Sequence, residues 1–236
     1  RPRRRAGRDG LRSPGNLLEA TGLVVGYGSL TAVDGVSLSL PRGRLTTLVG
    51  PSGCGKTTFL NLLSALLQPD AGKILVGDTR LDTLSRQQAQ RYRAETIGYI
   101  FQDFGLLDYL SARDNILHPF RIVPGRRISQ ALHEEVDALA KDLGIFEQLP
   151  RRPARLSHGE RQRVAICRAM VTRPVLMLAD EPTGNLDPES AARVMDILFN
   201  ARQRLDATLI MVTHDHGLLD RFDRVIDFRE HWGEVA

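Results

Sequence analysis

The sequence GPSGCGKT, Gly50–Thr57, matches the phosphate-binding pattern G-x-x-x-x-G-K-[ST]. An apolar segment, RLTTLVG, leads into it, and an apolar helical pattern, KTTFLNLLSALL, follows, as that pattern requires. Its glycines let the backbone curl so that several N–H groups face phosphate oxygens. Lys56 is expected to contact the β- and γ-phosphates, and the Thr57 hydroxyl to bind Mg²⁺. The residues expected to line the phosphates are Gly50, Ser52, Gly53, Cys54, Gly55, Lys56, Thr57 and Thr58.

We interpret Cys54 as a small tolerated residue, because no second feature supports a redox role.

Strand and helix patterns alternate along the rest of the chain. Alternating apolar residues with glycine breaks predict short, antiparallel strands over residues 17–40. Further strands are expected at 44–50, 72–81 (a pair), 96–102, 174–180, 207–215 and 223–228, and helices at 56–67, within 111–172 and at 189–205. This alternation predicts an α/β core with a mainly parallel sheet.

Two acids, Asp180 and Glu181, follow the continuous apolar strand pattern PVLMLAD. An isolated acidic pair is commonly a solvated loop or a helix cap, but the carboxyl edge of an open α/β sheet is where ligands bind. Phosphoryl transfer needs a carboxylate that holds metal and a group that orients the attacking water. Asp180 suits the first role, and Glu181 suits the second as a general base. The sequence therefore predicts Mg²⁺-dependent hydrolysis of a nucleoside triphosphate.

A second potential anion site begins the segment LSHGERQRVAICRAM, Leu156–Met170. Ser157 and Glu160 have the spacing of a capping box, which would stabilise the start of a helix. The same helix N-terminus would also suit a phosphate. The pattern alone leaves both interpretations open.

The composition is that of a globular protein, with 42% hydrophobic and 25% charged residues in 236. Its net charge of +4 comes mainly from arginines within residues 1–15, which we expect to form a disordered tail; an arm that touches anionic lipid headgroups is the alternative. The remainder is close to neutral, so we expect no nucleic-acid partner. The two cysteines indicate neither a zinc site nor a disulfide framework. No apolar run approaches the ~20 residues of a membrane span, so membrane association would require a partner.

With LSHGERQRVAI ahead of LADEPTGNLD, the chain resembles the ATP-binding subunit of an ABC transporter over residues 16–228. The segments FQDFGLLDYLSARDN and ADEPTGNLD are most similar to the branch of that family that contains LolD, MacB and FtsE. The resemblance implies an α/β fold with a P-loop NTPase core. It also implies an N-terminal antiparallel β subdomain and an inserted α-helical subdomain at roughly 105–172, within a nucleotide-binding domain at 16–236.

The resemblance also assigns the second anion site. In this family two copies pack head to tail, and each ATP lies between the phosphate loop of one copy and the signature motif of the other. Ser157 and the Gly159 backbone would then meet the γ-phosphate held by the partner. The other residues carried over are Tyr27 on adenine, Gln102 on the metal and the attacking water, Asp187 at the dimer interface and His214 on the γ-phosphate.

The implied partners are a second copy of this domain and integral membrane permease subunits, which would hold the chain at the cytoplasmic face of the inner or plasma membrane. The implied function is to energise an exporter or a lipoprotein-extruding system of the LolD/MacB type. An FtsE-like ATPase that transmits force and moves no substrate is the alternative. His158 and Glu160 depart from the commoner Leu-Ser-Gly-Gly-Gln signature, and we expect His158 to point away from phosphate. Trp232 is expected either to pack on the domain or to contact a partner.

Overall fold

The protein is described by a computed structural model that covers residues 15–28, 30–123, 125–184 and 186–231. The tail predicted at 1–15 lies outside this range except for Gly15, and Trp232 also lies outside it.

The described residues form strands and helices in the alternating order that the sequence predicts. The strands are β1 (Asn16–Tyr27), β2 (Leu30–Pro41), β3 (Leu45–Val49), β4 (Ala71–Val76), β5 (Thr79–Arg80), β6 (Ile97–Ile100), β7 (Leu176–Asp180), β8 (Thr208–Val212) and β9 (Arg224–Asp227). The α-helices are α1 (Lys56–Leu63), α2 (Arg86–Thr96), α3 (Ala112–Arg121), α4 (Gln130–Asp142), α5 (His158–Met170) and α6 (Pro188–Leu205). Short 3-10 helices lie at Phe146–Gln148, Pro153–Arg155, His216–Arg221 and Phe228–His231.

Two sheets organise these elements. Strands β6-β7-β8-β3-β9 form a sheet in which every described pairing is parallel, which confirms the predicted parallel core. Every residue of β7 and β8 is buried, as their continuous apolar sequences require of central parallel strands. Strands β2-β1-β4-β5 form a separate antiparallel sheet. The prediction of short strands over residues 17–40 is wrong, because β1 and β2 each run for 12 residues.

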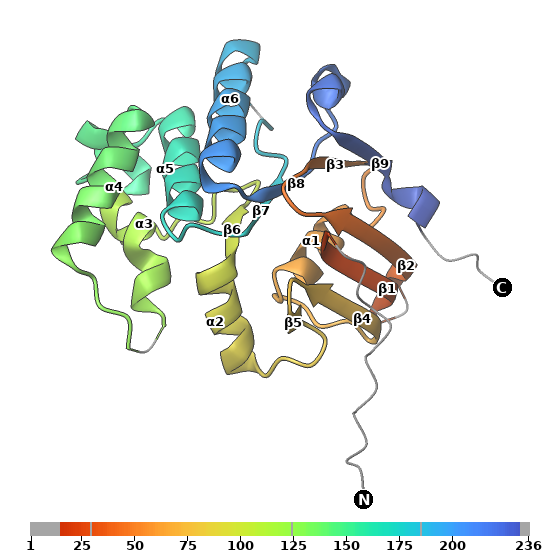
Figure 1. Ribbon diagram of the computed structural model, residues 1–236. Helices are drawn as coiled ribbons and strands as arrows, with labels where there is room; N and C mark the ends of the chain where they lie inside the picture. Colours follow the sequence, from red (N-terminus) through yellow and green to blue (C-terminus); the bar gives the residue numbers. More distant parts are fainter. Residues whose placement is uncertain (1–14, 29, 124, 185, 232–236) are drawn as a thin grey trace, which may run out of the picture.

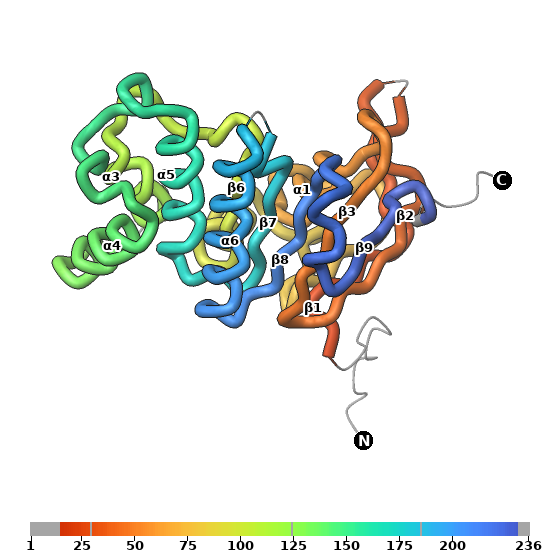
Figure 2. The backbone as a smooth tube through the Cα atoms, turned by 90° about the horizontal axis from the view of Figure 1, so that it is seen from above, coloured from red at the N-terminus to blue at the C-terminus, as the bar shows by residue number. Residues whose placement is uncertain are grey.

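The helices α3, α4 and α5 lie together at one end of the molecule, and the antiparallel sheet lies at the other (Figures 1 and 2). The parallel sheet lies between them. A serine caps the first turn of α2, α3, α4 and α5, where its side-chain oxygen accepts a hydrogen bond from a backbone N–H.

The sequence prediction misses one helix and places the ends of two other elements, α1 and β6, too late. Helix α2 is not predicted, because its sequence RQQAQRYRAET buries only Ala89, Tyr92 and Ala94 and lacks an apolar period. Helix α1 ends at Leu63, and Ala65 follows in a left-handed conformation with φ 52°. Strand β6 ends at Ile100, so Gln102 lies in the turn that follows the strand and not at the end of the strand.

Candidate functional site

The phosphate loop joins the end of β3 to the start of α1, at the carboxyl edge of the parallel sheet. Gly55 caps α1 with φ 92°, a left-handed conformation that other residues rarely adopt. A Cβ atom at Gly55 would lie 2.2 Å from the carbonyl oxygen of Ala32 on β2. Only glycine therefore lets the loop approach the antiparallel sheet this closely.

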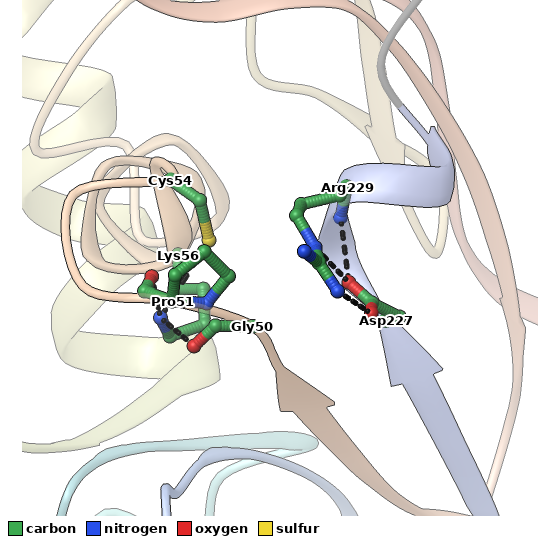
Figure 3. A network of polar contacts seen from close by, with 6 residues as sticks. All are labelled: Gly50, Pro51, Cys54, Lys56, Asp227 and Arg229. Atoms are coloured by element: carbon green, nitrogen blue, oxygen red, sulfur yellow. Dashed lines mark hydrogen bonds and ion pairs between the residues drawn. The ribbon is translucent and has the colours of Figure 1, made fainter.

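The Lys56 side chain lies across the loop (Figure 3). Its Nζ donates hydrogen bonds to the carbonyl oxygens of Gly50 at 2.9 Å and Pro51 at 2.8 Å, and it lies 3.6 Å from the Cys54 Sγ. The side chain is only 9% exposed, so its rotamers are restricted. A phosphate entering the loop would meet a positive charge that is already in position.

Asp227 lies beside the phosphate loop and forms an ion pair with Arg229. Asp227, at the end of β9, accepts hydrogen bonds from the Arg229 backbone N–H and guanidinium, with Nη2 to Oδ2 at 2.7 Å (Figure 3). The Arg229 side chain holds the pKa of Asp227 at about 2. A Cβ atom at Gly50 would lie 3.6 Å from Asp227 Oδ1, which shows how close this carboxylate is to the loop. Arg229 therefore offsets a negative charge that would otherwise oppose phosphate binding.

Asp180 lies at the end of β7 and is 5% exposed, and the Thr57 side chain of α1 lies close enough to influence its pKa. Burial raises the pKa of Asp180; the Thr57 side chain and the charge of Lys56 lower it, and the charge of Glu181 raises it. The net direction is upward. The fold therefore brings the two predicted metal-holding side chains, from the phosphate loop and from β7, near each other.

Glu181 follows β7 with φ 45°, a strained backbone conformation for a residue other than glycine. Its backbone N–H donates to the carbonyl oxygen of Val212, at the end of β8, at 3.0 Å. Its Oε1 lies 3.3 Å from Nδ1 of His214, whose side chain is 71% exposed. A hollow of about 570 Å³ opens beside both side chains. The structure therefore brings together two residues that are far apart in the sequence.

Gln102 and Tyr27 lie on two other elements, in the turn after β6 and at the end of β1. Gln102 is exposed and follows β6, which pairs with β7, so it lies on the same sheet edge as Asp180. Tyr27 ends β1 and is 51% exposed. It pairs with Leu30 at the tip of the hairpin whose second strand contacts Gly55. An exposed aromatic ring at this place is suited to stack on a planar base.

Ser157 is exposed at the N-cap of α5, and the predicted capping box is present. Its Oγ accepts from the Glu160 N–H at 3.3 Å, and its N–H donates to Glu160 Oε2 at 2.7 Å. That backbone bond is the main reason why the pKa of Glu160 is lowered. Strands β6 and β7 lie between α5 and α1 in both views, so the helix that Ser157 caps is separated from the helix that follows the phosphate loop (Figures 1 and 2). Asp187 caps α6 through the Ser190 N–H and is also exposed.

Sequence reasoning missed one group of contacts near Gln102. Phe104 lies in the same turn with φ 66°, and its ring packs edge-on against the His158 ring at 4.7 Å between centroids. Arg168, on α5, donates to the carbonyl oxygens of Phe104 and Gly105. The replacement of the usual signature glycine by His158 was the only sequence signal for these contacts.

A hollow of about 360 Å³ lies between the β6–α2 side and the α3–α5 side of the molecule. Its lining includes the apolar residues Leu66, Tyr99 and Phe101 and the basic residues Arg93, His118 and Arg168. None of its lining residues among the described part of the chain is acidic. Burial lowers the pKa of His118, and the nearby charges of Arg168 and Arg121 lower it further, which indicates a positive local potential. Within the described ranges, no helix combines the length and apolar character needed to cross a membrane.

Comparisons with known proteins agree with this fold. A sequence profile described as ABC transporter matches residues 33–184. The chain is 38% identical over 213 residues to "Lipoprotein-releasing system ATP-binding protein LolD 1" of Caulobacter vibrioides, covering 89% of this chain and 91% of that protein. It is 40% identical over 205 residues to "ABC transporter ATP-binding protein YxdL" of Bacillus subtilis, covering 87% and 79%. A solved structure of the ATP-binding cassette MJ0796, a post-hydrolysis dimer bound to ADP and Pi, has a TM-score of 0.81 at 27% identity, over 89% of this chain and 93% of that one.

Proposed function

The chain belongs to the ABC transporter family, and from this premise we propose that it binds and hydrolyses ATP to energise a membrane transport system. The observation that carries the proposal is the arrangement of Glu181, which lies beside the metal-suited pair Asp180 and Thr57 and 3.3 Å from His214. A carboxylate in this position is suited to take a proton from a water molecule that attacks the γ-phosphate.

The residues around Asp180 suit Mg²⁺, which prefers oxygen ligands. The Asp180 carboxylate, the Thr57 hydroxyl and the Gln102 side-chain carbonyl would hold it. When bound, Mg²⁺ would neutralise phosphate charge. Lys56 and the backbone N–H groups of the loop would orient the β- and γ-phosphates, and Tyr27 would stack on adenine. Glu181 would hold the proton of the attacking water, and His214 would orient Glu181 and contact the γ-phosphate.

We propose that two copies of the chain complete two ATP sites. The support is that Ser157 is exposed at the N-terminus of α5, a helix that β6 and β7 separate from α1 of the same chain. The dimeric relative bound to ADP and Pi is consistent with this arrangement. Gly159 would contribute its backbone beside Ser157, and the exposed Asp187 would lie at the dimer interface. ATP would then favour the closed dimer, because only that state offers both halves of the site.

We further propose that residues 16–236 form one nucleotide-binding domain with a helical subdomain at roughly 105–172. The packing of α3 on both α4 and α5 supports this division. The hollow of about 360 Å³ between this helical region and α2 would receive a cytoplasmic segment of the membrane permease. Its basic lining favours a segment that carries a carboxylate. The chain would thus be held at the cytoplasmic face of the inner or plasma membrane.

The relatives named for lipoprotein release support a LolD-type system over an FtsE-like ATPase that moves no substrate. We therefore propose that the transported molecule is a lipoprotein or a related substrate that is extracted from the membrane. Co-purification of the permease in mild detergent would identify the partner. A partner without a substrate-binding extracytoplasmic domain would favour the FtsE-like alternative.

Glu181→Gln tests the proposed hydrolysis. We expect kcat to fall at least ~100-fold, because the variant cannot accept the proton, while ATP affinity and ATP-induced dimers persist. Turnover is measured by phosphate release and dimerisation by light scattering. Glu189→Gln is a matched control, because it removes the same charge from an exposed position on α6. Near-normal hydrolysis by Glu181→Gln would refute the assignment.

A further inference from the structure

We propose that His158 is a positioning residue that ties the segment Phe101–Gly105 to the start of α5. Through this contact, the position of Ser157 on the partner's ATP would be coupled to the position of Gln102 in the chain's own site. The inference rests on the proposed function, because it assumes that Ser157 meets a nucleotide of the second copy.

The first support is the packing of the Phe104 ring. The His158 ring lies against it at 4.7 Å between centroids and 78° between planes. The Arg161 guanidinium lies 5.7 Å from the Phe104 centroid. His158 and Arg161 are three residues apart on α5 and share a helix face. Phe104 is only 8% exposed as a result, and the His158 Nδ1 is buried without a hydrogen-bond partner in the described structure.

The second support is the backbone of the same turn. Phe104 has φ 66°, which is costly for a residue other than glycine and persists only where surrounding contacts offset the cost. One such contact is the hydrogen bond from Arg168 Nη2 to the Phe104 carbonyl oxygen at 2.6 Å. The Phe104 N–H also donates to the Phe101 carbonyl oxygen at 3.0 Å and closes the turn around Gln102. Loss of the contacts from α5 would therefore relax the turn and displace Gln102.

The third support is the place of His158 in the chain. It directly follows Ser157, so any displacement of Ser157 by a phosphate reaches His158 through one peptide unit. The commoner signature has glycine here, which has no side chain that could reach Phe104. In this chain a side-chain contact therefore joins two loops that serve different ATP molecules of the dimer.

The experiment compares His158→Ala, His158→Phe and His158→Asn with a matched control, His133→Ala on α4. Hydrogen exchange of the Phe104 amide is measured in the full chain without nucleotide, and kcat and KM for ATP are measured separately. We expect His158→Ala to exchange about tenfold faster at Phe104, as loss of an aromatic contact predicts, and to lose severalfold in kcat with little change in KM. His158→Phe should restore both the exchange rate and kcat. His158→Asn should restore neither value. His133→Ala should leave both values as they are in the wild-type chain.

Unchanged exchange in His158→Ala would overturn the inference. Full recovery of kcat by His158→Asn would also overturn the inference. Asparagine offers a polar group but no ring, so its recovery would mean that His158 acts through a ring nitrogen on the partner's nucleotide and not through its packing on Phe104. The exchange measurement needs no ATP, so it tests the contact even if the wild-type chain fails to hydrolyse ATP. The two failures are therefore distinguishable.

Discussion

Ser157 has two proposed roles that substitution can separate, a helix cap and a contact with the partner's phosphate. Replacement by alanine removes the cap, in which the Glu160 N–H reaches Ser157 Oγ at 3.3 Å. Loss of an N-cap costs about 1 kcal/mol, which lowers Tm by about 2–4 °C in a chain of this length. Replacement by aspartate keeps the cap but places a negative charge against the phosphate.

The chain contains a matched control in the capping box of α2. There the Gln88 N–H reaches Ser85 Oγ at 3.3 Å, and the Ser85 N–H reaches Gln88 Oε1 at 2.8 Å. These distances match those at Ser157, where the second bond is 2.7 Å. We therefore expect Ser85→Ala and Ser157→Ala to lower Tm by similar amounts, measured by circular dichroism.

Dimerisation should distinguish the two serines. A hydrogen bond to a charged group contributes about 1.5–3 kcal/mol, and a symmetric dimer has two, which gives about 3–6 kcal/mol. Loss of both would raise the dimer Kd by roughly 10²- to 10⁴-fold. Light scattering with ATP in a Glu181→Gln background should show dimers for Ser85→Ala and Ser85→Asp but none for Ser157→Ala or Ser157→Asp. If Ser157→Ala loses only thermal stability and dimerises as Ser85→Ala does, the serine is merely a cap and the reasoning is refuted.

Substitutions at three further positions test the site. Lys56→Ala should weaken ATP binding by about 10- to 100-fold in a titration with a fluorescent analogue, because a charge-assisted bond is lost; unchanged affinity would contradict the phosphate loop. Burial raises the pKa of Asp180 in the folded chain. The charged carboxylate therefore destabilises the fold at pH values above that raised pKa, and this destabilisation is absent below the ordinary pKa of aspartate, where the group is protonated in both states. Asp180→Asn should therefore raise Tm in neutral buffer, with a benefit that disappears on acidification, and should abolish Mg²⁺-dependent turnover; a Tm difference independent of pH would contradict this. Tyr27→Ala should raise the Kd for ATP, whereas Tyr27→Phe keeps the ring and should bind normally; equal loss in both variants would exclude stacking.

Much of the parallel core could be predicted, because its signals are local. The glycines of the phosphate loop, the apolar runs of β7 and β8 and the spacing of Ser157 and Glu160 each depend on a few adjacent residues. The juxtaposition of Asp180 with Thr57 followed from the rule that parallel strands present ligands at one edge.

The parts that could not be predicted depend on contacts between distant segments. Helix α2 is held by a few small or aromatic residues within a polar sequence, so no apolar period marks it. The left-handed backbone of Phe104 has no signature of its own, because the side chains that offset its cost come from α5. The 3.3 Å approach of Glu181 and His214 requires the ends of β7 and β8 to be adjacent.

The backbone conformation of Glu181 implies a trade-off at this position between thermal stability and the rate of ATP hydrolysis. Its φ of 45° is better tolerated by asparagine or glycine, neither of which can serve as a general base. A laboratory selection for heat resistance alone would accordingly tend to replace this glutamate. The selected variants would be more stable to heat but would lack the proposed general base for ATP hydrolysis.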